Sequence, residues 1–139
     1  MINEYTFAQI EVGMEASFKV RITQAMMDSF RGVTGDENPM HTEKSYAEEN
    51  GFPGVVAYGL LVSSFYSTLA GVHLPGKYCL LQEVSTQFAL PVFVGDELSV
   101  SGKVVEKNDS VRQIVLKAQI LNQDGKKVNR AKIKAGVLR

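Results

Sequence analysis

The chain has 139 residues, 45% of them apolar, and its 15 basic and 15 acidic side chains balance to a formal net charge of zero. This length suits one domain with a real core, so we expect residues 1–139 to form a single domain. The absence of a basic excess argues against nucleic-acid and anionic-membrane partners. Zero net charge leaves room for self-association.

Two further observations limit the classes of protein to which the chain can belong. No uninterrupted apolar run approaches the ~20 residues that span a bilayer, and the N-terminal segment lacks the features of a secretion signal. Cys79 is the single cysteine, so an internal disulfide is excluded, and no Cys/His cluster suggests a zinc site. We therefore expect a cytoplasmic protein without a membrane partner and without a metal.

The first half of the chain has the pattern of one strand followed by helices. Residues 16–23 alternate apolar and polar side chains, with Phe18, Val20 and Ile22 set against Lys19 and Arg21, which predicts a short, half-buried strand. A helix is predicted to begin at Thr23 or Gln24 and to end at Gly35, because apolar residues recur there at helical spacing.

Two more helices are predicted before the strand-rich half. Thr42 can cap a short helix that Gly51 closes. The following stretch, residues 55–76, is apolar or small at nearly every position. A helix without a clean polar face is a buried helix, so the other elements must wrap it.

The second half of the chain predicts four strands, at residues 78–90, 96–107, 111–122 and 127–138. In the last two, apolar and polar residues alternate, which is typical of an antiparallel sheet with one face in water. Short polar turns join the last three strands into one meander. Helices packed on such a sheet give an α+β layer architecture.

The loop VTGDENPMH, residues 33–41, carries an acid and an imidazole five residues apart, Asp36 and His41. Pro39 forces Asn38 out of the helical region, and the Asn38 side chain can brace the turn. A carboxylate and an imidazole within reach of one water form a general acid–base pair. Partial burial against the apolar helix would make Asp36 a stronger base.

A purely structural interpretation of this loop is also open. Gly-Asp is common turn chemistry, and the chain contains a second example at Gly95 and Asp96. On residue types alone the structural interpretation is favoured.

A family resemblance changes this balance. FRGVTGDENPMHTEKSYA, residues 30–47, resembles the signature of the MaoC-like, R-specific enoyl-CoA hydratases: an aromatic residue, a short gap, a small residue, Gly-Asp-x-Asn-Pro-apolar-His, and a further small residue. GFPGVVAYGLLVSSFYS, residues 51–67, resembles the family's approach to its central helix. The resemblance extends over residues 16–138.

The resemblance implies the hot dog fold, a long central helix wrapped by a curved antiparallel sheet, and a homodimer or higher homo-oligomer. It implies an enzyme that adds water to, or removes it from, a 2-enoyl thioester of coenzyme A or an acyl-carrier protein. Asp36 and His41 would be the catalytic pair, with Asn38 and Pro39 supporting the loop. The implied reaction uses no separate cofactor, since the coenzyme or carrier belongs to the substrate.

The resemblance also assigns three residues of the central helix. The backbone N–H of Gly59 would bind the thioester carbonyl, although tight helix packing explains a glycine equally well. Ser67 matches a hydroxyl that bonds the catalytic carboxylate, and Ser63 and Ser64 are rivals for that role. Tyr58 stands where the hydratases usually have His. It is either a packed aromatic residue or a further group near the substrate.

Two alternative functions remain at this stage. A thioesterase on the same scaffold would hydrolyse the thioester and release a free thiol. A non-catalytic acyl-thioester-binding module would leave Asp36 and His41 pointing apart, or facing no cavity.

Overall fold

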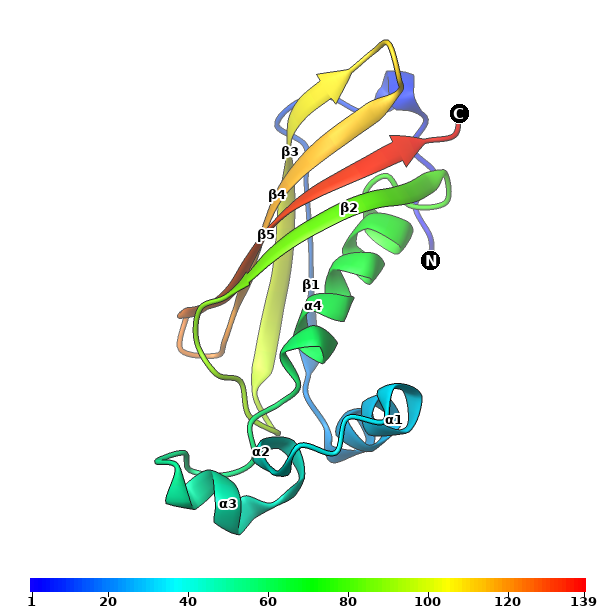
Figure 1. Cartoon of the computed structure of the whole chain (residues 1–139). Coiled ribbons are helices and arrows are strands. Elements are labelled where there is room, and N and C mark those ends of the chain that lie inside the picture. Colours follow the sequence, from blue (N-terminus) through cyan, green and yellow to red (C-terminus); the bar gives the residue numbers. More distant parts are fainter.

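Five strands form one curved antiparallel sheet in the order β1-β3-β4-β5-β2 (Figure 1). The computed structural model describes all residues, 1–139. The strands are β1 (Glu15–Arg21), β2 (Cys79–Phe88), β3 (Glu97–Asn108), β4 (Gln113–Leu121) and β5 (Lys127–Val137). All five predicted strands exist, and β3, β4 and β5 are neighbours, so the predicted meander is confirmed.

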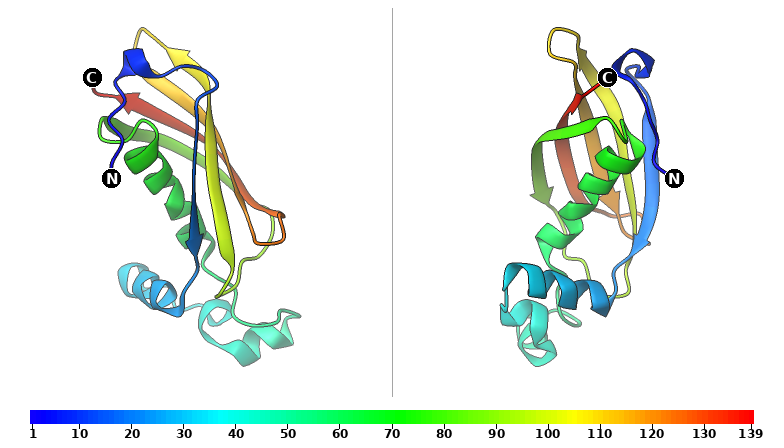
Figure 2. Two further views of the ribbon diagram at one scale, coloured as in Figure 1. Left: turned by 180° about the vertical axis from the view of Figure 1, so that it is seen from behind. Right: turned by 90° about the vertical axis from the view of Figure 1, so that its right-hand side faces the viewer.

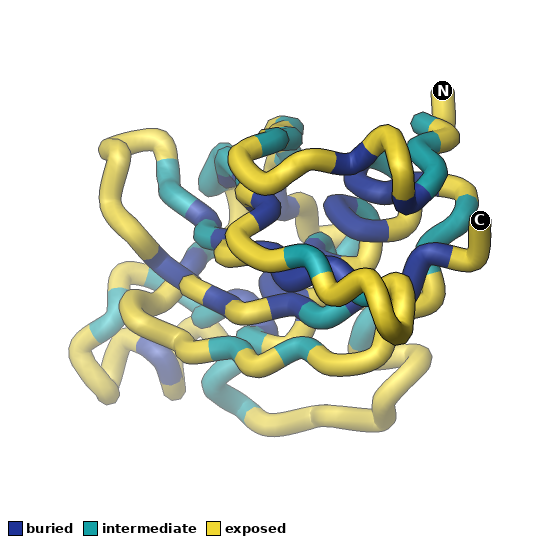
Figure 3. The backbone as a smooth tube through the Cα atoms, turned by 90° about the horizontal axis from the view of Figure 1, so that it is seen from above, coloured by how far each residue is buried: buried dark blue, intermediate teal, exposed yellow.

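The helix α4 (Gly59–Thr68) lies against one face of this sheet, which we call the inner face (Figures 1 and 2). It continues as a π-helical turn, η2 (Leu69–His73). Buried residues, dark blue in Figure 3, lie mainly on α4 and on the strands that face it. The helix begins later than predicted because residues 56–57 are extended: Val56 bridges Phe93, and the Ala57 N–H donates to the Val92 carbonyl at 2.7 Å.

One side of α4 is not covered within a single chain, as the right-hand view of Figure 2 shows. A stripe of residues at helical spacing is exposed there: Leu60, Ser64, Ser67 and Gly71. Leu60 keeps 64% of its surface in solvent. The expectation of a fully wrapped helix is therefore met only on the side that faces the sheet.

Three further helices lie beyond the N-terminal end of α4: α1 (Gln24–Thr34), α2 (Pro39–Thr42) and α3 (Lys44–Glu49) (Figure 1). The predicted limits of α1 are confirmed. The Thr23 hydroxyl caps its first turn, and Gly35 ends it at a φ of 71°, a conformation that favours glycine. A short 3-10 turn, η1 (Phe7–Gln9), precedes the sheet.

The predicted cap of the next helix was wrong. Thr42 does not begin α3 but ends α2, a one-turn helix that was not predicted, and its hydroxyl lies 3.4 Å from the Asn38 carbonyl oxygen to which it donates. Proline is well suited to a first helical position, so Pro39 starts a helix where only a loop was expected. None of the helices in the structure combines the length and apolar character needed to cross a membrane.

Candidate active site

The loop that carries the candidate acid and base is held by its own side chains. Asn38 is extended, with φ −55° and ψ 129°, and its Oδ1 atom accepts a hydrogen bond from the Met40 N–H at 2.9 Å. Pro39 occupies the first position of α2. This arrangement places His41 on a helical turn, so the predicted bracing of the loop is present.

The His41 ring is oriented by one short hydrogen bond. Its Nδ1 atom lies 2.6 Å from the Val56 carbonyl oxygen. A carbonyl oxygen can only accept, so Nδ1 carries the proton, and in the neutral ring Nε2 keeps a free lone pair. Val56 is fixed in turn, because its N–H donates to the Met40 carbonyl at 3.0 Å. The tautomer of His41 is therefore set by backbone that α2 itself positions.

The Asp36 carboxylate is exposed in the single chain. One oxygen, Oδ1, accepts from the Asn38 N–H at 3.0 Å, while Oδ2 has no hydrogen-bond partner in the chain. The backbone of Asp36 is tied at both ends, since its N–H donates to the Thr34 hydroxyl and its carbonyl accepts from the Tyr58 hydroxyl at 2.5 Å. The loop is thus fixed while one carboxylate oxygen stays available.

Tyr58 links the two candidate catalytic residues. Its side chain is buried, with its ring 4.2 Å from the His41 ring and 4.9 Å from that of Phe30, centroid to centroid. Burial, and secondarily the negative charge of Asp36, raise the pKa of the Tyr58 phenol, so it stays protonated and donates to the Asp36 carbonyl. Tyr58 is a packed aromatic residue that ties the Asp36 backbone to His41.

A pocket of about 280 Å³ opens beside His41. Its wall is mostly apolar, and the only side chains in it that carry nitrogen or oxygen are those of His41 and Asn129. Gly59, the first residue of α4, also lines it. Neither Tyr58, Asp36 nor Ser67 belongs to the lining.

Gly59 combines two properties that suit the predicted carbonyl-binding role. No side chain caps the N-terminus of α4, so the first amide N–H groups of the helix have no side-chain partner there. A Cβ atom at Gly59 would lie 3.0 Å from the Phe88 ring, which is tighter than ordinary contact. Close packing therefore also favours glycine, and both interpretations of Gly59 agree with the structure.

Ser67 is not brought to Asp36 within one chain. It lies on the exposed stripe of α4, two turns from the N-terminus, and its hydroxyl forms no hydrogen bond. Its rivals have other partners: the Ser64 hydroxyl donates to the Leu61 carbonyl at 2.5 Å, and Ser63 faces the sheet, where its hydroxyl is 3.0 Å from that of Thr86.

A buried hydrogen-bond network behind the pocket was not predicted. Asn129 on β5 is fully buried, accepts from the hydroxyls of Tyr66 and Thr86 at 2.8 Å each, and donates to the Ser63 hydroxyl at 3.0 Å. The signal in the sequence was an amide at an inward position of an otherwise apolar strand face. The network satisfies every member, as buried polar groups require.

Neither the single cysteine nor a cluster of metal-binding side chains adds a second candidate site. Cys79 is half-buried, and burial raises the pKa of its thiol, as expected of an inert cysteine. No three His, Cys, Asp or Glu side chains lie close enough together to hold a metal ion.

Comparison with known proteins identifies the family. Residues 7–125 match the family described as MaoC like domain. The chain belongs to the MaoC-like family. An (R)-specific enoyl-CoA hydratase of Aeromonas caviae is 33% identical over 116 residues, which is 84% of this chain and 87% of the relative. The unliganded R-hydratase PhaJ1 of Pseudomonas aeruginosa superposes with a TM-score of 0.92 at 28% identity, covering 98% of this chain and 87% of that one.

Another relative is named for a different thioester carrier, the acyl-carrier protein. A mitochondrial 3-hydroxyacyl-[acyl-carrier-protein] dehydratase of Solanum lycopersicum, FERN, is 34% identical over 82 residues, covering 59% of this chain and 46% of the relative. The similarity in sequence and structure confirms both the family resemblance and the predicted hot dog fold.

Proposed function

We propose that the chain is a hydratase and dehydratase of acyl thioesters, adding water across the 2,3-double bond of an enoyl thioester or removing it in reverse. The observation that carries this proposal is His41, whose ring lines an apolar pocket with its tautomer fixed by Val56 and its Nε2 lone pair free. The named relatives, an enoyl-CoA hydratase and a 3-hydroxyacyl dehydratase, support the same reaction.

In the proposed hydration, the substrate's double bond lies beside His41. The Nε2 atom accepts a proton from water as the water oxygen bonds to C3. The electron pair of the double bond moves toward the thioester carbonyl, and the imidazolium returns the proton to C2. Asp36 does not line the pocket in the single chain, and in the assembled dimer its free Oδ2 atom would accept the other water hydrogen and so hold the water in line.

Gly59 is the hydrogen-bond donor to the thioester carbonyl in this scheme. The developing negative charge on the thioester oxygen is stabilised by the Gly59 N–H and by the positive end of the α4 dipole. Because the chemistry consists of proton transfer and carbonyl polarisation, it needs neither a metal nor a redox cofactor. The coenzyme A or carrier-protein moiety enters only as part of the substrate.

The acyl group in this proposal is short. In the single chain the pocket of about 280 Å³ is slightly smaller than the volumes that small-molecule sites usually have. Among its lining residues, Asn129 is fixed by the buried hydrogen-bond network and cannot turn aside without leaving polar groups unpaired. We therefore expect activity to fall as the acyl chain grows beyond the short members of a series.

A homodimer paired along β2 is part of the proposal. The two edges of the sheet differ: β1 carries the charged side chains of Glu15, Lys19 and Arg21, which discourage pairing. β2 and the residues after it expose apolar side chains instead, namely Leu80, Leu81, Phe88 and Leu90. A second copy on that edge would cover this apolar surface and the open stripe of α4.

Such pairing would also complete the site. Ser67 and the Asp36 carboxylate are both exposed in the single chain, and an intersubunit contact is the remaining way for Ser67 to act as predicted. A cytoplasmic location is likewise part of the proposal, supported by the single unpaired cysteine.

The deciding experiment follows crotonyl-CoA with the purified chain. Hydration removes the ultraviolet absorbance of the conjugated double bond without releasing thiol, whereas a thioesterase would release thiol that a disulfide reagent detects. A longer enoyl-CoA series and the corresponding carrier-protein thioesters then define the acyl length and the carrier. Thiol release without hydration, or binding without turnover of any enoyl thioester, would reject the proposal.

The dimer is tested separately by light scattering on a sizing column. We expect twice the mass of one chain, and expect Leu81→Lys, on the exposed edge, to shift the protein toward the monomer. A monomeric parent protein would exclude the dimer without touching the assignment of His41.

A further inference from the structure

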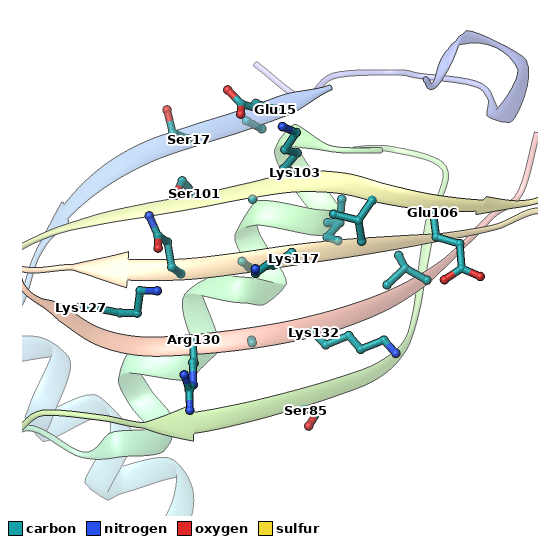
Figure 4. A pocket seen from close by; sticks show the side chains of 18 of the residues that line it. Glu15, Ser17, Ser85, Ser101, Lys103, Glu106, Lys117, Lys127, Arg130 and Lys132 are labelled. Atoms are coloured by element: carbon teal, nitrogen blue, oxygen red, sulfur yellow. The ribbon is translucent and has the colours of Figure 1, made fainter. Parts of the chain in front are cut away.

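The face of the sheet that points away from α4, which we call the outer face, carries an unusual row of charges (Figure 4). Lys103 on β3 lies directly opposite Lys117 on β4, and Lys117 lies directly opposite Lys132 on β5. We call these three residues the lysine row. Like charges directly opposite one another on neighbouring strands destabilise a sheet. The arrangement therefore works against the stability of the isolated chain.

The lysine row is not neutralised within the molecule. None of its three side chains forms an ion pair, although six ion pairs occur elsewhere on the chain. Glu15 lies opposite Lys103 in the register with β1, yet it is not within ion-pair distance. The charges are available to a partner.

The surface around the lysine row is hollowed and polar. It forms an open hollow of about 1050 Å³, whose lining has five cations and two carboxylates. Beside the row runs a second one, in which Ser101, Gln119 and Arg130 are opposite one another on adjacent strands. These hydroxyl, amide and guanidinium groups can bind the polar atoms of a partner that the lysines attract.

We propose that the outer face docks an acidic α-helix of another protein along the lysine row. Neighbouring strands are about 4.8 Å apart, so the row spans roughly 10 Å from Lys103 to Lys132. A helix rises 1.5 Å per residue, so carboxylates at positions i, i+3 or i+4, and i+7 span about 10.5 Å along one face. An acidic helix lying across the strands would thus place one carboxylate over each lysine.

Other polyanions fit this surface less well. The hollow contains no aromatic side chain on which the bases of a single-stranded nucleic acid could stack, and the chain as a whole has no net positive charge. A membrane surface would need apolar side chains to insert, but the exposed apolar residue of the lining is Val105 alone.

The docking surface is independent of the proposed reaction. The sheet separates the lysine row from α4, because the row alternates along each strand with side chains that face the helix, such as Val104, Leu116 and Ile133. Losing the docked helix would leave His41 and its pocket unchanged. Docking of an acidic helix on the outer face therefore does not depend on which reaction the pocket catalyses.

The test uses a fluorescent helical peptide with glutamates at i, i+4 and i+7 on one face, and a peptide of equal composition with the glutamates distributed around the helix. Binding to the full chain is measured by anisotropy at low and at physiological ionic strength. We expect salt-sensitive binding of the first peptide, weakened about tenfold in the triple variant Lys103→Gln, Lys117→Gln, Lys132→Gln.

A matched variant controls for net charge. Lys44→Gln, Lys77→Gln and Lys126→Gln remove the same charge outside the hollow and should leave peptide affinity unchanged, while crotonyl-CoA turnover should be unaffected in both triple variants. Equal loss in both, equal binding of the two peptides, or no salt-sensitive binding at all would overturn the proposal. So would stronger binding to duplex DNA or to phosphatidylserine–phosphatidylcholine vesicles than to the acidic helix.

Discussion

The two faces of the sheet differ in whether their polar side chains have partners within the chain. Thr86 and Asn129 on the inner face form a closed set of hydrogen bonds with Ser63 and Tyr66 of α4, and no buried side-chain polar atom lacks a partner. On the outer face, three lysines stand directly opposite one another without any partner.

Solvent explains why one chain tolerates both arrangements. A buried polar group without a partner loses its hydration, which lowers the free energy of unfolding, so every member of the inner network must have a hydrogen-bond partner. Exposed like charges are screened by water and salt, so the lysine row lowers the stability of the chain only slightly. Folding therefore determines which polar residues the inner face can carry, whereas the charged residues of the outer face can be chosen for binding a partner.

The largest expected effect is on catalysis, and it comes from removing the candidate acid and base without disturbing the buried core. We expect Asp36→Asn and His41→Ala each to reduce kcat for crotonyl-CoA hydration by about 10²–10⁴-fold, because each removes a proton-transfer or water-holding group. Circular dichroism and melting should stay close to the parent, since Asp36 is exposed and His41 only half-buried. Retained turnover in both variants would remove the proposed mechanism.

Breaking the inner network should give the largest loss of stability. Asn129→Ala leaves the Tyr66 hydroxyl buried without an acceptor, so we expect a loss of about 3 kcal/mol in the free energy of unfolding by urea denaturation. Gln119→Ala is the matched control on the outer face. It should change stability by no more than about 0.5 kcal/mol. Equal effects at the two positions would contradict the contrast between the faces.

Much of the fold was readable from the sequence because strands and hairpin turns leave local patterns. The alternation at residues 111–138 reflects one buried and one solvated face, and the Gly35 that ends α1 has a positive φ. α2 escaped prediction since a single turn has no periodicity, and Pro39 can open either a loop or a helix.

The site was predictable only where its signal is local. Asp36, Asn38, Pro39 and His41 lie within six residues, so one motif reveals them. The Asn129 network joins residues 43 to 66 positions apart, which no local pattern encodes. The contact of Tyr58 with the Asp36 carbonyl, 22 positions away, was likewise invisible until the fold brought them together.

The dependence of stability on alkaline pH tests the burial of the Tyr66 phenol. Burial raises the pKa of the Tyr66 phenol above its unfolded value of about 10. The folded state thus holds the proton more tightly, so this stabilisation is complete below about pH 10 and is lost as pH rises further. We expect Tyr66 to contribute a slope of up to about 1.4 kcal/mol per pH unit there, which Tyr66→Phe should remove. An unchanged slope in that variant would show that another group dominates.

Tyr58→Phe should separate positioning from binding. The variant keeps the ring against His41 but loses the hydrogen bond to the Asp36 carbonyl, worth about 1 kcal/mol. We expect kcat to fall about fivefold with KM unchanged, because Tyr58 does not line the pocket. Tyr46→Phe, on the exposed surface, should leave both constants unchanged. A rise in KM alone would assign Tyr58 to substrate binding instead.

The smallest expected effect concerns the outer face, and it is a gain in stability where Asn129→Ala gives a loss. Lys117 is the middle of the row and has a like charge opposite on each side, so Lys117→Gln should stabilise the chain by about 0.5 kcal/mol at low salt. The gain should vanish as salt is added, because exposed charges are screened. Lys126→Gln, in the β4–β5 turn and outside the row, should give no gain. If Lys117→Gln destabilised the chain instead, the lysine row would contribute to folding, and its presence would need no partner to explain it.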